Sequence, residues 1–313
     1  MAKKNKLKEF EEFWDRKRII TSVIIVAVAA FWVYVNTGLE TYPADTYLSS
    51  IQVLDETVTF DRYVMDRTQP IFYNRGPTAV LLLHGFGGSP YELKEMAEYL
   101  AQRNISVYAP LLAGHGSTID YLSKVTWQEV VEDANRALQI LKRNYDKVYV
   151  GGICNGGLTA LYLAENEDFD GVISMATPIY VSFKWLEYLP TRQILQGLRL
   201  ITKYVRKITY GAVMDNDAVR GMPVFEGAPV TELINVFDLS DAARENLAKI
   251  DEPVLIIQSL FDNRAAPESA QFIFETVSSE DKTLVYLNNS AHIITVDYDK
   301  HIVNEGVYKF VSR

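Results

Sequence analysis

The fold of this chain is decided at residues 147–160, Lys147-Val-Tyr-Val-Gly-Gly-Ile-Cys-Asn-Gly-Gly-Leu-Thr-Ala160. β-Branched and aromatic residues, typical of a strand, enter this stretch, and a helix-forming run leaves it at Leu158. Where a strand turns abruptly into a helix, the residue at the apex takes a strained backbone conformation, and glycines two positions before and after it avoid side-chain collisions. The pattern Gly152-Ile-Cys154-Asn-Gly156 therefore predicts a strand, a turn and a helix, with the Cys154 side chain exposed at the turn.

The position of Cys154 makes it a candidate nucleophile. At the N-terminus of the predicted helix, the amide dipoles favour the thiolate form of a cysteine. The alternative is a lone buried cysteine that packs as a small hydrophobic side chain. The strand, turn and helix around Cys154 favour the nucleophile.

Composition excludes several classes of function. The chain has 313 residues, of which 48% are hydrophobic and 23% charged, as in ordinary globular domains. Its net charge of -9 argues against a nucleic-acid partner, which needs a basic surface. One cysteine excludes an intrachain disulfide, and four scattered histidines lack the spacing of metal ligands. We therefore expect neither a metal nor another cofactor.

The N-terminal region has the pattern of a membrane anchor. Residues 1–18 are polar with an excess of basic residues, and residues 19–39 carry no charge. That length suits a membrane-spanning helix, and Trp32 and Tyr34 suit its interfacial end. No lysine or arginine follows until Arg62. The positive-inside rule predicts a single-pass protein of the cell membrane, with a cytoplasmic N-terminal tail and an extracytoplasmic catalytic domain.

Two alternatives apply to the apolar segment at 19–39. One is a buried core helix, which the charged flank disfavours. The other is a signal peptide cleaved after Ala27-Val-Ala29, although apolar residues continue past that site. We favour an uncleaved signal-anchor. Residues 40–50 are interpreted as a linker, and residues 51–313 as one domain.

Strands and helices alternate through this domain. One or two opening strands are expected at a sheet edge within residues 51–65, and buried strands are predicted at 79–83, 105–109, 147–152, 171–176, 253–258 and 282–287. Amphipathic helices are predicted at 92–102 and 127–143. This order predicts an α/β fold, with a mostly parallel central sheet covered by helices on both faces.

An insertion of about residues 178–250 interrupts the alternation. It shows no buried strand, but helical stretches rich in Leu, Tyr and Ile at 185–210 and 230–250. An insertion of this size between two sheet strands predicts a helical cap over the carboxyl edge of the sheet, where sites of α/β proteins lie. The alternative is that these helices pack on the sheet.

Three segments together resemble the α/β-hydrolase family. They are His84-Gly-Phe-Gly-Gly-Ser-Pro90, the pattern around Cys154, and Asp262 followed by His292. The first segment, with Tyr108-Ala-Pro-Leu-Leu-Ala-Gly-His-Gly116, is most similar to bacterial carboxylesterases and monoacylglycerol lipases. The chain departs from the family's usual serine at residue 154. The resemblance implies an α/β-hydrolase fold and an acyl-transfer chemistry.

The resemblance also implies the roles of the site residues. Cys154 would be the nucleophile, His292 the base that takes its proton, and Asp262 the acid that orients the imidazole. Asp297 and Asp299 are rival candidates for the acid. His301 is interpreted as a solvated helix residue.

The loop after the first buried strand would stabilise the reaction's oxyanion. The backbone N–H groups of Phe86 and Asn155 are the candidate donors. His84 and His115 are interpreted as structural residues whose side chains fix loops by hydrogen bonds.

Three functions follow from these residues. The first is a membrane-anchored acyl hydrolase that takes a small-molecule or lipid-derived ester and forms a thioester at Cys154. The second is an acyltransferase that passes the acyl group to an acceptor other than water. The third is a non-catalytic binding or scaffold protein, which the retained His292 and Asp262 disfavour.

Overall fold

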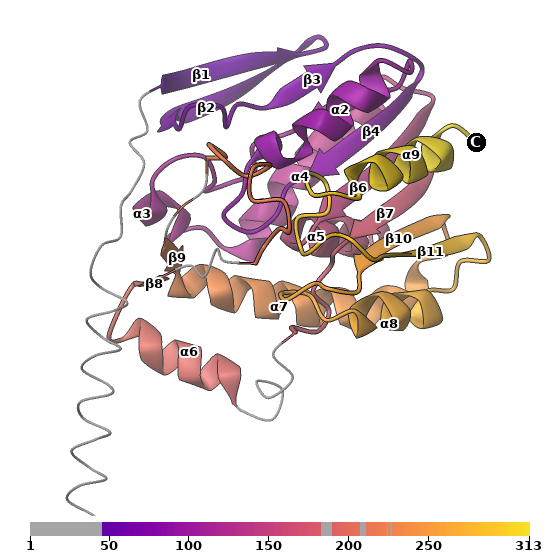
Figure 1. Cartoon of the computed structure of the whole chain (residues 1–313). Coiled ribbons are helices and arrows are strands. Elements are labelled where there is room, and N and C mark those ends of the chain that lie inside the picture. Colours follow the sequence, from indigo (N-terminus) through magenta and orange to yellow (C-terminus); the bar gives the residue numbers. More distant parts are fainter. Residues whose placement is uncertain (1–45, 183–189, 207–210, 224, 226) are drawn as a thin grey trace, which may run out of the picture.

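The computed structural model describes residues 46–182, 190–206, 211–223, 225 and 227–313. Its centre is a seven-stranded sheet (Figure 1). In spatial order, the strands are β11 (Lys282–Leu287), β10 (Val254–Ser259), β7 (Gly171–Met175), β6 (Lys147–Ile153), β4 (Thr78–Leu83), β5 (Ser106–Ala109) and β3 (Ile71–Tyr73). Neighbouring strands run parallel except β3, which is antiparallel to β5. The predicted mostly parallel sheet is confirmed.

Helices cover both faces of this sheet. One face packs against α2 (Lys94–Ala101) and α9 (Lys300–Val311), and the other against α4 (Trp127–Lys142), α5 (Asn155–Ala164) and α8 (Glu268–Thr276). Strand β4 shows why, since Ala79, Leu81 and Leu83 enter one core while Val80 and Leu82 enter the other. Successive side chains of a strand point to opposite faces, so a strand apolar throughout requires cover on both sides.

The shorter helices lie at the ends of strands. They are η1 (Pro90–Leu93), α3 (Ile119–Leu122) and η3 (Leu247–Lys249). Helix α4 begins at a capping box: the Thr126 hydroxyl accepts the Glu129 N–H, and the Glu129 carboxylate accepts the Thr126 N–H at 2.8 Å. This pair satisfies two backbone donors that the first helical turn would leave without partners.

The opening strands form a sheet of their own. Strands β1 (Thr46–Val53) and β2 (Glu56–Val64) pair antiparallel with each other and not with the central sheet. The expectation of strands within 51–65 is therefore confirmed, but their place at the edge of the main sheet is wrong. Strand β1 begins at Thr46, inside the segment interpreted as a linker.

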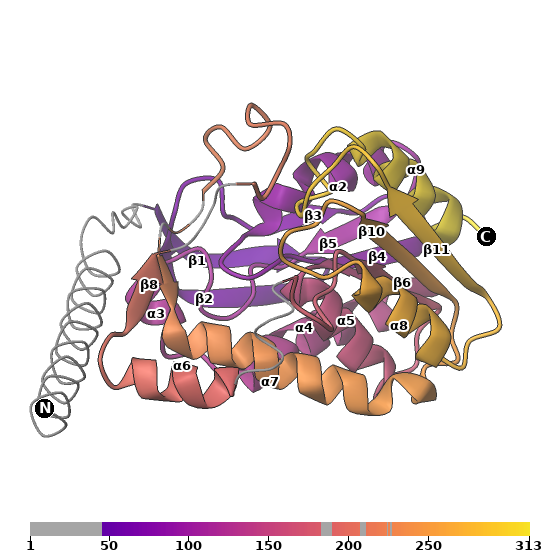
Figure 2. The same cartoon turned by 60° about the horizontal axis from the view of Figure 1, so that its bottom comes forward.

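The insertion after β7 contains both helices and strands. Helix α6 (Thr191–Arg199) and helix α7 (Val230–Asn246) lie against each other (Figure 2). Between them, β8 (Tyr204–Arg206) pairs antiparallel with β9 (Gly227–Pro229). The predicted helix over 185–210 is wrong at its C-terminal end, because residues 204–206 are a strand. A strand of three residues is too short to show an alternation of apolar and polar side chains, so the sequence does not indicate it.

Helix α7 belongs to the main core as well as to the insertion. Its C-terminal half contributes Leu239 and Ala243 to the main core, and the helix packs along α5. The alternative of ordinary sheet-covering helices thus holds for this part of the insertion. Helix α6 has no buried residue and lies outside α7.

The predicted membrane span at 19–39 lies outside the described residues. Within the described ranges, no helix has the length and apolar composition needed to cross a bilayer.

Candidate active site

The turn between β6 and α5 has the conformation that the sequence predicts. Cys154 has φ 54° and ψ -119°, in a region that non-glycine residues rarely adopt. Its N–H donates to the Met175 carbonyl of β7 at 2.9 Å, and its own carbonyl accepts the N–H groups of Gly157 and Leu158 in the first turn of α5. The strained backbone is therefore held on both sides, and the Cys154 side chain lies at the helix N-terminus.

Two glycines allow the backbone to close around this turn. A Cβ on Gly152 would lie 2.1 Å from the Gly156 carbonyl oxygen, and a Cβ on Gly156 would lie 2.1 Å from the Leu83 carbonyl oxygen. No side chain fits at either position without moving the backbone of a neighbouring segment. The spacing of the glycines thus reflects contact between β4, β6 and α5.

Replacing Gly156 with alanine is expected to lower the free energy of unfolding by about 3 kcal/mol, the cost of overpacking a rigid site. The matched control is Gly197→Ala on α6, where an added Cβ meets nothing within 4 Å. Alanine has the higher helix propensity, so the control should be unchanged or slightly more stable. Urea denaturation of the full-length chain measures both. Equal stability of the two variants would contradict the steric argument.

His292 and Asp262 meet beside this turn. His292 Nδ1 lies 2.8 Å from Asp262 Oδ2 and 2.9 Å from Oδ1, and both side chains are buried. The Cys154 side chain is near enough to His292 for a charge on the sulfur to raise the pKa of the imidazole. Asp262 follows β10 and His292 follows β11, so the carboxyl ends of parallel strands bring the two residues to the turn after β6. The structure therefore brings Cys154 together with the hydrogen-bonded pair of His292 and Asp262.

Further hydrogen bonds orient the Asp262 carboxylate. Its Oδ1 accepts the backbone N–H groups of Arg264 and Ala265 at 2.8 and 2.9 Å, and its Oδ2 accepts the Gln258 side-chain amide at 3.0 Å. The backbone N–H of His292 donates to the Ala212 carbonyl at 3.0 Å, which connects the histidine to the insertion. These bonds restrict rotation of both partners, as a preorganised site requires.

The rival carboxylates serve other purposes. Asp297 accepts the backbone N–H groups of Met214 and Ala291 at 2.8 Å, and Asp299 accepts that of Asn289 at 2.8 Å. Both residues are buried and hold the loops that surround His292. The geometry favours Asp262 as the partner of the imidazole.

The neighbours of His292 favour its charged form. Burial alone lowers the pKa of His292, but the charges of Asp262 and Cys154, together with the hydrogen bonds to both side chains, raise it to about 10. Part of this shift depends on a negative charge at Cys154. An acylated sulfur carries no charge, so acylation would lower the pKa of His292 and favour the neutral base.

Arg264 is a neighbour of the site that sequence reasoning did not single out. Burial lowers the pKa of its guanidinium, and the charges of Cys154 and Asp262 partly offset that shift. The residue follows Asp262 in a loop, a position with no pattern that would mark it.

The predicted oxyanion donors come from two segments that meet at Cys154. Asn155 is the first residue of α5, where backbone N–H groups have no partner within the helix. Phe86 follows Gly85, and a Cβ on Gly85 would lie 3.1 Å from the Cβ of Cys154. The loop therefore approaches Cys154 closely. The side-chain oxygen of Asn155 is buried and has no hydrogen-bond partner among the described residues. The oxyanion roles of Phe86 and Asn155 remain predictions.

Glu92, also missed from the sequence, lies beneath this loop. The side chain is buried in η1, and its Oε1 accepts the backbone N–H of Gly85. A Cβ on Gly88 would lie 2.6 Å from the other carboxyl oxygen. The carboxyl group thus fills the space inside the turn from Gly85 to Gly88 and fixes the peptide that precedes Phe86. A glutamate at the start of a helix ordinarily faces solvent, so the sequence did not indicate this contact.

Glu92→Leu is expected to lower kcat about 10- to 100-fold, because an unsatisfied buried donor costs about 1–3 kcal/mol and would let the oxyanion loop shift. Glu92→Gln retains an acceptor oxygen and similar volume, so its kcat should stay within a few-fold of wild type. Steady-state kinetics on a p-nitrophenyl ester, with thermal unfolding of each variant, measures the effect. Wild-type kcat in a folded Glu92→Leu variant would contradict the positioning role.

The remaining histidines have partners other than Cys154 and Asp262. His84 Nε2 accepts the Leu112 N–H at 3.2 Å, and His115 Nδ1 lies 2.9 Å from the Ala113 carbonyl oxygen. The two rings pack edge to face, with centroids 4.8 Å apart, between the loops after β4 and β5. His301 is exposed on α9. These positions agree with the structural interpretation of His84 and His115 and with a solvated His301.

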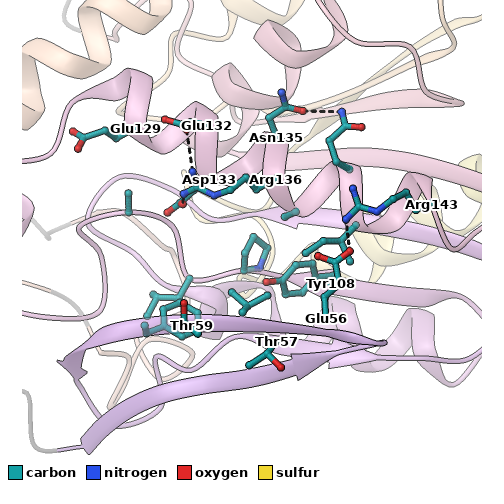
Figure 3. A pocket seen from close by; sticks show the side chains of 18 of the residues that line it. Glu56, Thr57, Thr59, Tyr108, Glu129, Glu132, Asp133, Asn135, Arg136 and Arg143 are labelled. Atoms are coloured by element: carbon teal, nitrogen blue, oxygen red, sulfur yellow. Dashed lines mark hydrogen bonds and ion pairs between the residues drawn. The ribbon is translucent and has the colours of Figure 1, made fainter.

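A cavity of about 850 Å³ lies elsewhere, between β2 and α4 (Figure 3). None of its lining residues is a predicted site residue. Its charged groups pair with one another, including Arg143 with Glu56 and Arg136 with Glu132 and Asp133. Nowhere in the described part of the chain do three His, Cys, Asp or Glu side chains gather as they would around a metal ion.

Comparison with known proteins agrees with this geometry. Residues 77–299 match the family model Hydrolase_4, described as serine aminopeptidase, S33. The chain belongs to this family. It is an α/β-hydrolase, and the match covers the nucleophile turn, Asp262 and His292. The family's description names serine, whereas residue 154 of this chain is cysteine.

Individual relatives are lipases and esterases. The chain is 28% identical over 251 residues to a thermostable monoacylglycerol lipase from Bacillus sp. (strain H-257), covering 80% of this chain and 96% of that protein. It is 27% identical over 248 residues to a carboxylesterase from Bacillus subtilis (strain 168), covering 78% and 96%. A solved structure of a metagenome-derived lipolytic enzyme superposes with a TM-score of 0.73 at 24% identity, covering 80% and 99%. The predicted type, similar to bacterial carboxylesterases and monoacylglycerol lipases, is confirmed.

Proposed function

We propose that this protein is a membrane-anchored carboxylic ester hydrolase that works through a thioester at Cys154. The observation that carries the proposal is that Cys154, at a strained strand-to-helix turn, lies beside the hydrogen-bonded pair of His292 and Asp262. The lipase and esterase relatives support an ester as the substrate. The anchor and the apolar insertion favour a lipid-derived ester.

In the first half-reaction, the Cys154 thiolate attacks the ester carbonyl carbon, and the carbonyl electrons move to oxygen. The N–H groups of Phe86 and Asn155 stabilise the oxyanion. The intermediate collapses, the carbon–oxygen bond breaks, and the leaving alkoxide takes a proton from His292 Nε2. The products are an alcohol and a thioester at Cys154.

In the second half-reaction, neutral His292 takes a proton from water, and the hydroxide attacks the thioester. Asp262 holds Nδ1–H so that Nε2 faces the reaction. The intermediate expels the Cys154 thiolate and releases the carboxylic acid, which restores the thiolate and the imidazolium. The loss of sulfur charge during acylation thus converts His292 from an acid into a base between the two steps.

The anchor is the part of the proposal that rests on sequence. The charge asymmetry around residues 19–39 supports a single span with residues 1–18 in the cytoplasm. The catalytic domain would then lie outside the cytoplasm at the cell membrane. This arrangement would place the site near lipid-derived substrates and away from cytoplasmic coenzyme A thioesters.

Acyl transfer is the second candidate function. The observation that favours it is cysteine at residue 154, because a thioester reacts with amines, alcohols and thiols as well as with water. The same line of residues would serve, with His292 taking the proton of the acceptor. A non-catalytic scaffold role remains the third candidate.

One experiment distinguishes these functions. The full-length chain in detergent micelles is incubated with a panel of p-nitrophenyl esters while product release and intact mass are followed. A hydroxylamine-labile adduct that forms and turns over in water supports the hydrolase. An adduct that persists until an alcohol or amine is added favours acyl transfer. No adduct and no release with any ester would favour a scaffold.

The protonation state of His292 gives a further prediction. The raised pKa of His292, about 10, keeps the imidazolium charged from neutral pH to about pH 9. We expect the ring-proton NMR signals of His292 to keep the chemical shifts of an imidazolium over this range. The variant His292→Gln lacks these signals and so assigns them. A titration midpoint of about 6.5, the ordinary value for histidine, would contradict the raised pKa of His292.

A further inference from the structure

Large apolar side chains are exposed at the C-terminal end of α6. Leu200 is 86% exposed and Ile201 is 68% exposed, the highest values among large hydrophobic residues in the described ranges. Ile194, on the preceding turns of the same helix, is 50% exposed. We call these three residues the α6 tip. Such clustering on one short segment is unusual for a surface in contact only with water.

Ion pairs set the orientation of this helix. Arg192 Nε lies 2.8 Å from Asp238 Oδ1, and Arg192 Nη2 lies 2.6 Å from Asp241 Oδ2, both on α7. Arg244 of α7 joins the same group through Asp241. These contacts hold one side of α6 against α7. The exposure of the α6 tip is therefore a property of the docked helix.

Every charged residue of the segment that carries the α6 tip is basic. Between Pro190 and Arg206 the chain has four basic residues and no acidic residue, in a protein of net charge -9. Arg199, Lys203 and Arg206 are exposed. Lys203 also lies 3.9 Å from Asp120, with most of its side chain in solvent. Apolar side chains among exposed cations fit the boundary of an anionic lipid bilayer, where the cations meet headgroups and the apolar groups enter the acyl region.

The place of the α6 tip in the fold brings it toward the predicted anchor. Strand β8, which follows the tip, and the start of β1 lie at the same end of the molecule in both views (Figures 1 and 2). The apolar segment at 19–39 ends seven positions before Thr46. Seven residues span at most about 25 Å. An anchored chain therefore keeps this end of the domain close to the bilayer.

We propose that the α6 tip docks on the anionic surface of the membrane and orients the catalytic domain there. The proposal rests on the membrane anchor of the proposed function for proximity, and on its own exposed residues for binding. Docking would hold the insertion, which contacts His292 through Ala212, at the headgroup level. A lipid-derived ester would then reach the site without crossing open water.

Site-directed spin labelling tests this contact in the full-length chain. Cys154→Ser removes the native cysteine, and Ile201→Cys then accepts a nitroxide. The matched control is Ile302→Cys, an isoleucine that is 43% exposed on α9, a helix that lies away from β8 in both views. Each labelled chain is reconstituted in vesicles of phosphatidylcholine with and without phosphatidylglycerol, and its collisions with oxygen and with a water-soluble nickel complex are compared.

Docking predicts that the label at 201 is protected from the nickel complex and accessible to oxygen. This protection should be stronger with phosphatidylglycerol in the vesicles. The label at 302 should stay accessible to the nickel complex. Equal aqueous exposure of both labels would overturn the proposal. An alkaline carbonate wash followed by flotation tests the anchor separately. A chain that the wash releases, but whose label at 201 was protected beforehand, would overturn the anchor and support the α6 tip.

A paired activity measurement gives a second readout. Leu200→Ser with Ile201→Ser alters only exposed side chains outside the active site. Hydrolysis of a long-chain ester embedded in the vesicles should fall by about 3- to 10-fold as the apolar contact is lost. Hydrolysis of soluble p-nitrophenyl acetate should be unchanged. Equal rates on the embedded ester for wild type and variant would overturn the orienting role.

Discussion

Replacing Cys154 with alanine is expected to lower kcat for p-nitrophenyl ester hydrolysis by about 10⁴- to 10⁶-fold, the range for loss of a covalent nucleophile. The variant keeps the backbone turn, since alanine has the same Cβ, but it has no atom that forms an acyl bond. Intact mass should show no adduct. The expected residual rate comes from the oxyanion donors alone.

The companion variant Cys154→Ser separates the nucleophile from the turn. Serine is close in size, and His292 lies in place to take its proton. Its activity should fall between those of the wild type and Cys154→Ala, and its adduct should be an ester instead of a thioester. Turnover by Cys154→Ala equal to the wild type would exclude Cys154 as the nucleophile.

Replacing Asp262 with asparagine is expected to lower kcat by about 10³- to 10⁴-fold, because the wrong histidine tautomer would face the nucleophile. Loss of the Asp262 charge also removes a main cause of the raised pKa of His292. The imidazolium would therefore lose its proton at lower pH. Steady-state kinetics and the NMR titration of His292 measure the two effects.

The matched control for this prediction is Asp297→Asn. Asp297 is also buried, but it accepts backbone N–H groups of Met214, Asp215 and Ala291. We expect its loss to lower the free energy of unfolding by about 1–3 kcal/mol, the cost of unsatisfied buried groups. Its kcat should stay within about tenfold of wild type, which corresponds to a change of at most about 1.4 kcal/mol in the activation free energy. The reverse pattern would reassign the acid to Asp297.

Much of the fold could be predicted because the buried strands are apolar on both faces. The run Ala79-Val-Leu-Leu-Leu83 supplies two cores at once, and the predicted strand matches β4 within one residue. The turn at Cys154 was predictable for a similar reason. Gly156 is required by a steric contact with Leu83, 73 residues earlier in the chain, and this requirement leaves a local pattern in the sequence.

The remaining elements depend on contacts that leave no local pattern. Strands β8 and β9 have three residues each, too few for a period, and their pairing crosses the insertion. The separate sheet of β1 and β2 has the same alternation as an edge strand would have. Only the folded positions distinguish the two arrangements.

The candidate active site also combines residues that a sequence pattern indicates with residues that only the folded structure reveals. Chain order favoured Asp262, but Asp297 and Asp299 lie nearer to His292 in sequence, and only the distances to the imidazole distinguish them. Glu92 gains its role from burial against the turn from Gly85 to Gly88, and Arg264 lies where the charges of Cys154 and Asp262 affect its pKa. The sequence positions of the two residues reveal neither contact. Roles that belong to a sequence motif could be predicted, whereas roles that depend on which residues meet in the folded chain could not.

The single cysteine has a consequence for oxidative conditions. Peroxide converts a reactive thiolate to a sulfenic acid, and enzymes that carry a second cysteine recover by forming an internal disulfide. This chain has no second cysteine, so oxidised Cys154 forms a disulfide only with a thiol from another molecule. A serine relative would be unaffected by the same oxidant. Activity would therefore follow the redox state of the surroundings, and its recovery would depend on an external reductant.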